Sequence, residues 1–213
     1  ILVPFLTLLV SVTLALFIIG PMFHSVENYI LIIVEKILTL PLGIGGLLYG
    51  CFGQLLGILG IHHVLSLLEI NMLASTGWNL LNPIGSCGNI AQAGAVLAVA
   101  MKYKSVKMKQ LAYPSSLSAL LGITEPAVFG VTLRLVKPFI MSMIAGGIGG
   151  CLASILGLKA NGMSLTGIPG ILLYLNNQLP LYILVSVITF VIAFGLTYMF
   201  GVNEKSIDKE NTK

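Results

Sequence analysis

Glu125 is a carboxylate within the sequence Gly-Ile-Thr-Glu-Pro, residues 122–126, of a chain that contains few acids. Between residues 5 and 200 the other acidic residues are Glu27, Glu35 and Glu69. An ionised carboxylate accepts several hydrogen bonds, so it can bind paired hydroxyl groups such as those of a sugar. We therefore take Glu125 as the first candidate for a ligand-binding residue, and Glu69 as a secondary one.

The residues beside Glu125 disfavour a continuous helix. Pro126 lacks an N–H and restricts Glu125 to extended or turn geometry, while Gly122 permits φ angles that other residues avoid. Backbone groups freed by such a break must be satisfied by protein, water or a ligand, which favours a binding site here. The structural alternative is that Glu125 forms an ion pair with Arg134, Lys137 or a histidine.

Two adjacent histidines, His62 and His63, are the next candidates. A neutral imidazole both donates and accepts hydrogen bonds, which suits a hydroxyl ligand. Neighbouring residues point in different directions, so we expect one of the two to face the ligand. One or both are alternatively core or interface histidines. A zinc site would need further ligands at matched spacing, and because they are missing we predict no metal and no cofactor.

Polar residues recur along one apolar stretch, as Asn82, Ser86, Asn89 and Gln92. Steps of four, three and three residues place them on one face of a helix. The amides of Asn89 and Gln92 are good partners for hydroxyl groups. The alternative is that these amides make hydrogen bonds between helices.

The composition is that of an integral membrane protein. The 213 residues are 57% hydrophobic and 8% charged, whereas a soluble domain carries about 25% charged residues. The short alternating segments of a membrane β-barrel are missing. An ionisable group at membrane depth costs about a few kcal/mol and marks a functional site by default, which strengthens the case for Glu125. The lysines of residues 102–109 are too few, and too close to apolar spans, for nucleic-acid binding.

Membrane helices need about 20 apolar residues, and five stretches qualify: residues 4–19, 42–59, 83–101, 138–158 and 181–202. Residues 25–40 fit an amphipathic helix in the membrane interface better than a span. Residues 60–78 are too polar for a lipid-facing span and are predicted to be re-entrant or interfacial. We expect an outer loop over residues 161–180 and a polar cytoplasmic tail over residues 203–213.

Residues 111–130 are predicted to form a re-entrant hairpin. About ten residues lie on each side of the break at residues 122–126, too few for two spans of about 20 residues. Basic residues mark the cytoplasmic side, and they flank the segment at residues 102–109 and again at Arg134 and Lys137. Both ends of the segment are therefore expected on the same side of the membrane.

The chain begins at Ile1 within an apolar run, without an initiator Met or a signal sequence. We therefore expect a fragment that lacks its N-terminal part. Cys51, Cys87 and Cys151 lie far apart without any CxxC spacing. They are expected to be small core residues.

Three segments resemble the membrane subunits (enzyme IIC) of bacterial sugar phosphotransferase systems, in their glucose superfamily. They are GITEPAVFGVTLRLVKPF at 122–139, GIHH at 60–63 and NPIGSCGNIAQAGAVLAV at 82–99, in the order and spacing of that family. The combination of NIAQAGA with GIHH is most similar to the sucrose-type branch. The trehalose and β-glucoside branches remain open.

The resemblance implies an all-α polytopic transporter with re-entrant hairpins, acting as a homodimer, of which residues 1–202 form the C-terminal part. It implies that Glu125 and a histidine of the 62–63 pair bind the sugar. We also expect Thr124, beside Glu125, and the amides of Asn89 and Gln92 to bind it. A phosphocysteine of the IIB domain, supplied through IIA, HPr and enzyme I, would phosphorylate the sugar on the cytoplasmic side. The chain has no IIB cysteine motif, so we expect no catalytic residue in it.

Three other functions remain open. An ion-coupled secondary transporter, with Glu125 as the titrating group, shares the broken backbone and the membrane carboxylate. A sensor that binds sugar without transporting it shares the site. An inactive remnant shares the motifs.

Overall fold

The computed structural model describes residues 2–19, 29, 32–34, 36–38, 40–60, 62–163, 166–175 and 177–202, and of residues 2, 19 and 62–64 it describes the backbone alone. The part so described is all-helical, without a strand, and two segments meet only in an isolated bridge between Asn79 and Ala160. The all-α prediction is thereby confirmed. Four helices are long and apolar enough to cross a membrane, over residues 41–58, 81–102, 137–155 and 179–201.

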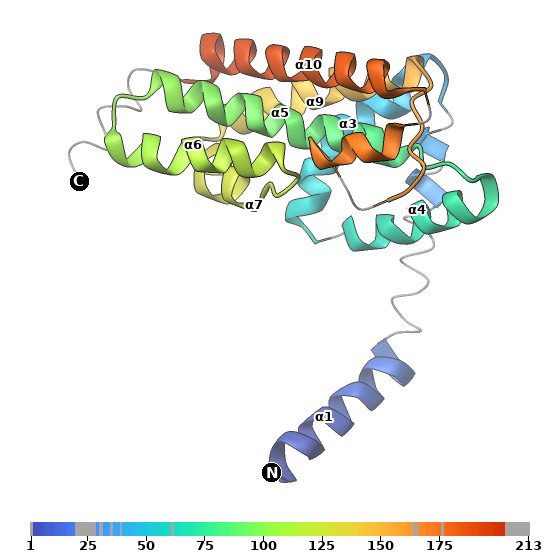
Figure 1. The fold of residues 1–213 in the computed structure, drawn as a ribbon. Coiled ribbons are helices and arrows are strands. Elements are labelled where there is room, and N and C mark those ends of the chain that lie inside the picture. The colour runs from blue at the N-terminus through green and yellow to red at the C-terminus, as the bar shows by residue number, and fades with distance from the viewer. Residues whose placement is uncertain are drawn as a thin grey trace. The chain divides into compact units, whose positions relative to one another are not determined.

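Figure 1 shows the order of the helices along the chain. They are α1 (Leu2–Leu14), α3 (Ile44–Ile58), α4 (His62–Thr76), α5 (Leu81–Lys102), α6 (Val106–Leu120), α7 (Glu125–Ala127), α8 (Leu133–Leu135), α9 (Lys137–Ile155) and α10 (Leu179–Leu196). Short 3₁₀ turns cover Pro41–Gly43 and Pro169–Tyr174, and π-helical turns cover Ala15–Ile19, Val128–Thr132 and Thr197–Gly201.

The chain divides into two compact units, residues 1–36 and 37–213. The first contains α1 and the π-helical turn after it, an apolar helix over residues 3–18 that is shorter than the four candidate spans. The other helices named above belong to the second unit. The predicted spans at residues 42–59, 83–101, 138–158 and 181–202 correspond to α3, α5, α9 and α10 to within a few residues. The first predicted span, residues 4–19, stays a prediction.

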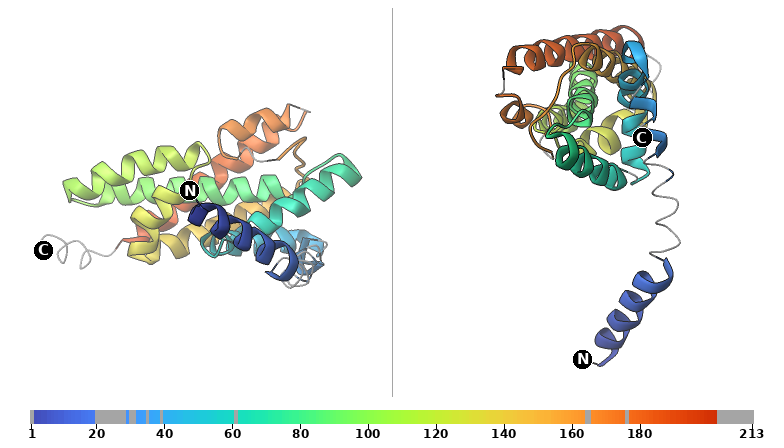
Figure 2. Two further views of the ribbon diagram at one scale, coloured as in Figure 1. Left: turned by 90° about the horizontal axis from the view of Figure 1, so that it is seen from below. Right: turned by 90° about the vertical axis from the view of Figure 1, so that its right-hand side faces the viewer.

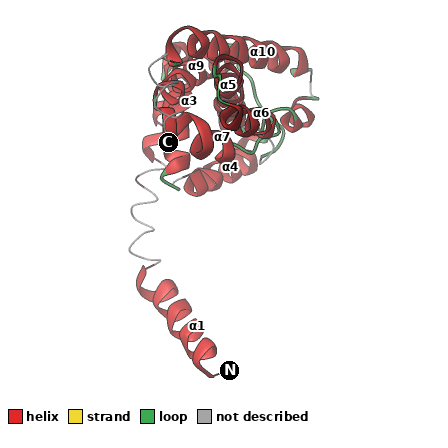
Figure 3. Cartoon of the chain, turned by 90° about the vertical axis from the view of Figure 1, so that its left-hand side faces the viewer, coloured by secondary structure: helices red, strands yellow, loops and turns green. Residues whose placement is uncertain are grey.

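Helix α5 is the central element of the second unit. It packs against α3, α6, α9 and α10, and the end-on view of Figure 3 shows these helices around it. The left view of Figure 2 shows α6 running alongside α5. Most of α5 is buried, including its polar residues Asn82, Ser86 and Gln92. A helix enclosed in this way can carry polar side chains through a membrane because protein, and not lipid, surrounds them.

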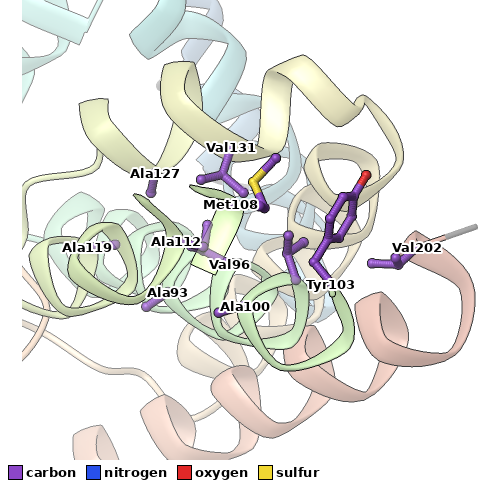
Figure 4. Packing of buried hydrophobic residues seen from close by; sticks show 11 residues of the cluster. Ala93, Val96, Ala100, Tyr103, Met108, Ala112, Ala119, Ala127, Val131 and Val202 are labelled. Atoms are coloured by element: carbon purple, nitrogen blue, oxygen red, sulfur yellow. The ribbon is translucent and has the colours of Figure 1, made fainter. Parts of the chain in front are cut away.

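Small side chains fill the contact between α5 and α6. Ala93, Val96 and Ala100 of α5 meet Ala112 and other residues of α6 and of the segment after it in one buried cluster, shown in Figure 4. Residues of this size allow two helices to approach closely. The cluster thereby holds the α6 arm of the hairpin against the central helix.

The predicted break at residues 122–126 is a tight turn between two helical arms. The N–H of Ile123 donates to the carbonyl of Ser118, and the N–H of Gly122 to that of Ala119, both at 3.0 Å. This pattern, with Gly122 at a φ of 92°, is the glycine-terminated helix end known as the Schellman motif. Pro126 then stands in the first turn of the returning arm, where its missing N–H costs nothing. Glycine thus ends one helix and proline begins the next.

The glycines of α3 allow it to cross α9 in direct backbone contact. A Cβ added at Gly146 would lie 2.8 Å from the carbonyl oxygen of Gly50, closer than two such atoms approach. Small residues on both helices thereby let their backbones approach closely.

Several sequence-based expectations fall on residues that the structure does not describe. Half of residues 25–40, the predicted interfacial helix, lie outside the described residues, and the tail at 203–213 lies wholly outside them. Residues 161–180, predicted as an outer loop, contain the 3₁₀ turn Pro169–Tyr174. Residues Thr166 to Ile168 lie against the tip of the hairpin, because the N–H of Ile168 donates to the carbonyl of Leu120 at 2.7 Å.

Candidate functional site

A cavity of about 460 Å³ lies between α3, α4, α5, the turn into α7 and the loop after α9. This volume is within the range of about 300 to 1,000 Å³ that is usual for small-molecule sites. Its wall includes Glu125, Thr124, Asn89, Gln92, Glu69 and Gln54. Five of the residues that the sequence made candidates for ligand binding, Glu69 among them as the secondary one, therefore meet in one place.

Glu125 begins the returning arm of the hairpin, directly after the turn. Its side chain is exposed and forms part of the cavity wall, and no described residue makes a hydrogen bond to its carboxylate. Neither Arg134 nor Lys137, its expected alternative partners, lines the cavity. A carboxylate in the first turn of a helical segment lies near unpaired backbone N–H groups, which stabilise its charge. Glu125 is thus placed to accept hydrogen bonds from a ligand.

Asn89 links the central helix to the loop that covers the hairpin tip. Its Nδ2 donates to Thr166 Oγ1 at 2.7 Å. A Cβ at Gly122 would lie 2.9 Å from the same Thr166 oxygen, so glycine is required for the loop to pack this closely. Thr166 was not predicted from the sequence, because its contribution depends on the packing of a loop remote along the chain.

Gln92 and Gln54 belong to a buried hydrogen-bond network. Gln92 Nε2 donates to Gln54 Oε1 at 2.6 Å, and Thr132 Oγ1 donates to Gln92 Oε1 at 2.9 Å. Ser142 Oγ donates to Gln54 Oε1 at 3.1 Å, and Gln54 Nε2 donates to the carbonyl of Gly88 at 2.9 Å. The Gln92 side chain is fully buried. Its amide has protein partners and fixes one part of the cavity wall.

Glu69 lines the cavity from α4 and is held by Asn79. Asn79 Nδ2 donates to Glu69 Oε2 at 2.7 Å, while Asn79 Oδ1 accepts the N–H groups of Leu81 and Asn82 at 2.9 and 3.1 Å. Asn79 is completely buried. Burial raises the pKa of the Glu69 carboxyl above its ordinary value, and the hydrogen bond from Asn79 opposes that rise.

The face of α5 that lines the cavity carries fewer of the predicted polar residues than the sequence indicated. Asn82, Asn89 and Gln92 line the cavity together with Gly85 and Gly88. Ser86 is buried but is not part of the cavity wall. At about 100° per residue, Ser86 lies about 40° beyond Asn82, on the side away from the other four. The step of four residues from Asn82 to Ser86 therefore turns the Ser86 side chain just out of the face that lines the cavity.

The histidine pair stands where the chain enters α4. The helix begins at His62, and the side chains of both histidines lie outside the described residues. Leu65, Ser66 and Glu69 of the same helix line the cavity. The assignment of a histidine to the site stays a prediction.

The sequence contains one feature that could have identified Gln54 in advance. It is the only amide in a glycine-rich apolar span, and a lone amide in such a span needs a polar partner. Cys51, Cys87 and Cys151 are free thiols, with Cys87 buried and the other two half-buried. Only Cys87 is the fully buried core residue that we expected.

Residues 1–147 match the family model described as "Phosphotransferase system, EIIC". The chain belongs to this family. It is 40% identical over 199 residues to the sucrose-specific EIIBC component of Salmonella typhimurium, covering 92% of this chain and 44% of that protein. It is 37% identical over 213 residues to the sucrose-specific EIIBC component of Bacillus subtilis, covering 99% and 46%.

A trehalose-specific EIIBC component of Bacillus subtilis is 34% identical over 197 residues, 92% of this chain and 42% of that protein. The chain thus spans less than half the length of these relatives. No solved structure matches it. Membership of the EIIC family, together with the four apolar helices, makes it a multi-pass protein of the bacterial cell membrane.

Proposed function

We propose that the chain is the sugar-translocating part of a phosphoenolpyruvate-dependent phosphotransferase system. In this proposal it binds sucrose, or a related disaccharide or glucoside, in the cavity and presents it to an EIIB domain for phosphorylation. One observation carries the proposal: Glu125, Thr124 and Asn89, from two segments that carry the family resemblance, converge on a cavity of about 460 Å³.

Each residue has a role that follows from its surroundings. Glu125 accepts hydrogen bonds from two sugar hydroxyls, because no described residue occupies its carboxylate. Thr124 and Asn89 add neutral donors and acceptors on either side. A histidine of the 62–63 pair binds a further hydroxyl. Gln92 contributes by fixing the wall, because its amide is already bonded to Gln54 and Thr132.

The charge of the cavity favours a neutral sugar over its phosphate. Among the described residues of the wall the charged side chains are Glu69 and Glu125, and no Lys or Arg is present. Two carboxylates in a partly desolvated site repel a phosphate group. When a phosphoryl group passes from the EIIB cysteine to a sugar hydroxyl, which loses its proton, the product is therefore expelled. This gives uptake its direction.

The partners follow from the same proposal. EIIB and EIIA, with HPr and enzyme I upstream, supply the phosphoryl group. The names of the relatives join EIIB to EIIC in one chain, and in a Pediococcus pentosaceus relative also EIIA. The bilayer surrounds the protein, and a homodimer is the proposed assembly.

The test is a phosphoenolpyruvate-dependent phosphorylation assay on membranes that contain the full-length protein. Sucrose, trehalose and a β-glucoside would be supplied with purified enzyme I, HPr and the matching EIIA and EIIB. The expected result is a phosphorylated product of one or more of these sugars. The control is the same membranes without phosphoenolpyruvate, which should form none.

Two other results would point to a different function. Accumulation of unmodified sugar without phosphoenolpyruvate would identify an ion-coupled transporter, for which Glu125 offers a titratable group without a described protein partner. Binding of sugar without uptake or phosphorylation would identify a sensor. Absence of both binding and phosphorylation would contradict the proposal.

A further inference from the structure

The cavity has a second carboxylate, Glu69, to which the proposed function assigns no contact with the sugar. Glu69 lines the wall from α4, and a completely buried residue, Asn79, donates a hydrogen bond to its Oε2 at 2.7 Å. Hydrogen bonds hold both the oxygen and the nitrogen of the Asn79 side-chain amide. Its Oδ1 accepts the first N–H groups of α5, and its Nδ2 also donates to the carbonyl of Gly162 at 3.2 Å. Because its donor is held in place, the Glu69 carboxylate is oriented for binding before a ligand arrives, which means that it is preorganised.

Glu69 and Glu125 lie near different ends of the stretch of α5 that lines the cavity. Glu69 is tied through Asn79 to the start of α5, beside Asn82. The turn before Glu125 packs on Thr166, which is bonded to Asn89. Asn82 and Asn89 are seven residues apart, about 10 Å along a helix. Figure 1 shows α4 near the start of α5 and α7 farther along it.

The spacing of their supports along α5 accommodates a ligand of two linked sugar rings. A molecule of two linked rings spans that length, with one ring at each acid. The wall between the two acids includes Gly85 and Gly88, which have no side chains to divide the space.

We propose that Glu69, positioned by Asn79, is a specificity-determining residue that binds the second ring of a disaccharide while Glu125 binds the first. This inference rests on the proposed function and adds to it a residue and the part of the sugar that the residue binds. Asn79 is a positioning residue, since its amide is fully used in holding Glu69, Gly162 and the start of α5.

The test measures equilibrium binding of radiolabelled sucrose and trehalose to the purified full-length protein in detergent. The variants are Glu69→Gln, Glu125→Gln, the double variant and Asn71→Ala, an exposed residue of the same helix. For the bound disaccharide, Glu69→Gln should weaken binding about tenfold, the effect of one charge-assisted hydrogen bond. The two Glu→Gln effects should add, because the residues contact different rings. Asn71→Ala should bind as the wild type does.

A one-ring competitor and the melting temperature complete the test. Methyl α-glucoside should displace labelled disaccharide from the wild type at least about tenfold less well than the unlabelled disaccharide, because it misses one of the two acids. Glu69→Gln should not lower the melting temperature. Unchanged binding in Glu69→Gln, equal displacement by the one-ring competitor, or a binding loss that accompanies a lower melting temperature would each overturn the inference. A wild type that binds neither sugar would instead refute the proposed function.

Discussion

Glu125 and Glu69 line the same cavity, but the protein holds their carboxylates in different ways. Glu125 stands at a turn between two short helical arms, exposed and without a hydrogen bond from any described residue. Glu69 stands inside a continuous helix, half-buried, with Asn79 bonded to it. The first is free to follow a ligand, whereas the second is fixed before the ligand arrives.

This difference indicates that two parts of the site have different roles. Part of the wall is rigid, because α3, α5, α9 and the returning arm are joined by the bonds of Gln54, Gln92, Thr132 and Ser142. The hairpin tip is joined to its surroundings by a few bonds to the loop at 166–168. A transporter needs both properties, a fixed surface that selects the sugar and a movable one that releases it.

The largest expected effect is that of Glu125→Gln. The amide keeps the shape of the side chain but makes weaker hydrogen bonds than a carboxylate. Losing two charge-assisted bonds of about 1.5 kcal/mol each should weaken sugar binding about a hundredfold. Uptake of labelled sugar by cells that express the full-length protein measures this. Unchanged uptake would remove Glu125 from the site.

Gln92→Leu should act on stability. It removes two buried hydrogen bonds, one from Thr132 and one to Gln54, although each of these side chains keeps another partner. The expected cost is about 1 to 3 kcal/mol. The expected result is a lower melting temperature in detergent, with sugar affinity changed less than in Glu125→Gln. Gln110→Leu, an exposed glutamine of α6, is the matched control. Loss of affinity at an unchanged melting temperature would instead make Gln92 a direct sugar ligand.

The contrast between the two acids also predicts a pH dependence for Glu69→Gln. Burial raises the pKa of the Glu69 carboxyl, so the folded state binds this proton more tightly than the unfolded state does. The ionised group therefore costs stability as pH rises through the raised pKa. Glu69→Gln should melt at a slightly higher temperature than the wild type at neutral pH. The advantage should vanish below the ordinary pKa of glutamate, and a gain that is equal at both pH values would contradict this explanation.

The smallest effect is expected from Thr166→Val, which removes the acceptor of the Asn89 bond at the hairpin tip. One neutral hydrogen bond contributes about 0.5 to 1.5 kcal/mol, so sugar affinity should change by a few-fold. Thr197→Val is the control, because Thr197 is buried but its Oγ1 has no hydrogen-bond partner in the described residues. A loss of sugar affinity as large as that of Glu125→Gln would contradict this expectation. It would show that the bond to Asn89 holds the hairpin tip rigidly in place.

Local sequence rules predicted the elements of the fold well. Length and apolarity located α3, α5, α9 and α10, and the glycine and proline around Glu125 predicted the turn, because each acts on the backbone of its own neighbourhood. The site was predicted in part. Glu125, Asn89 and Gln92 line one cavity, as their polar character among apolar neighbours indicated, and Thr124 lines it beside Glu125.

The remaining features depend on contacts between distant segments. Gln54 and Gln92 are 38 residues apart and Asn89 and Thr166 are 77 apart, and no local pattern pairs them. Asn79 resembles an ordinary turn residue in the sequence. Its importance comes from the carboxylate, the carbonyl and the helix end that meet at its amide. Ser86 was wrongly placed on the cavity face, because a small difference in angle around the helix decides whether a side chain faces the cavity.

The most direct test of the central claim is a cryo-electron microscopy structure of the full-length protein with the sugar that the phosphorylation assay identifies. The account predicts density for the sugar in the cavity between α3, α4, α5 and α7, with hydroxyl groups within hydrogen-bond distance of the Glu125 carboxylate. A sugar bound elsewhere, or a Glu125 carboxylate paired with a basic residue while the sugar is bound, would contradict it.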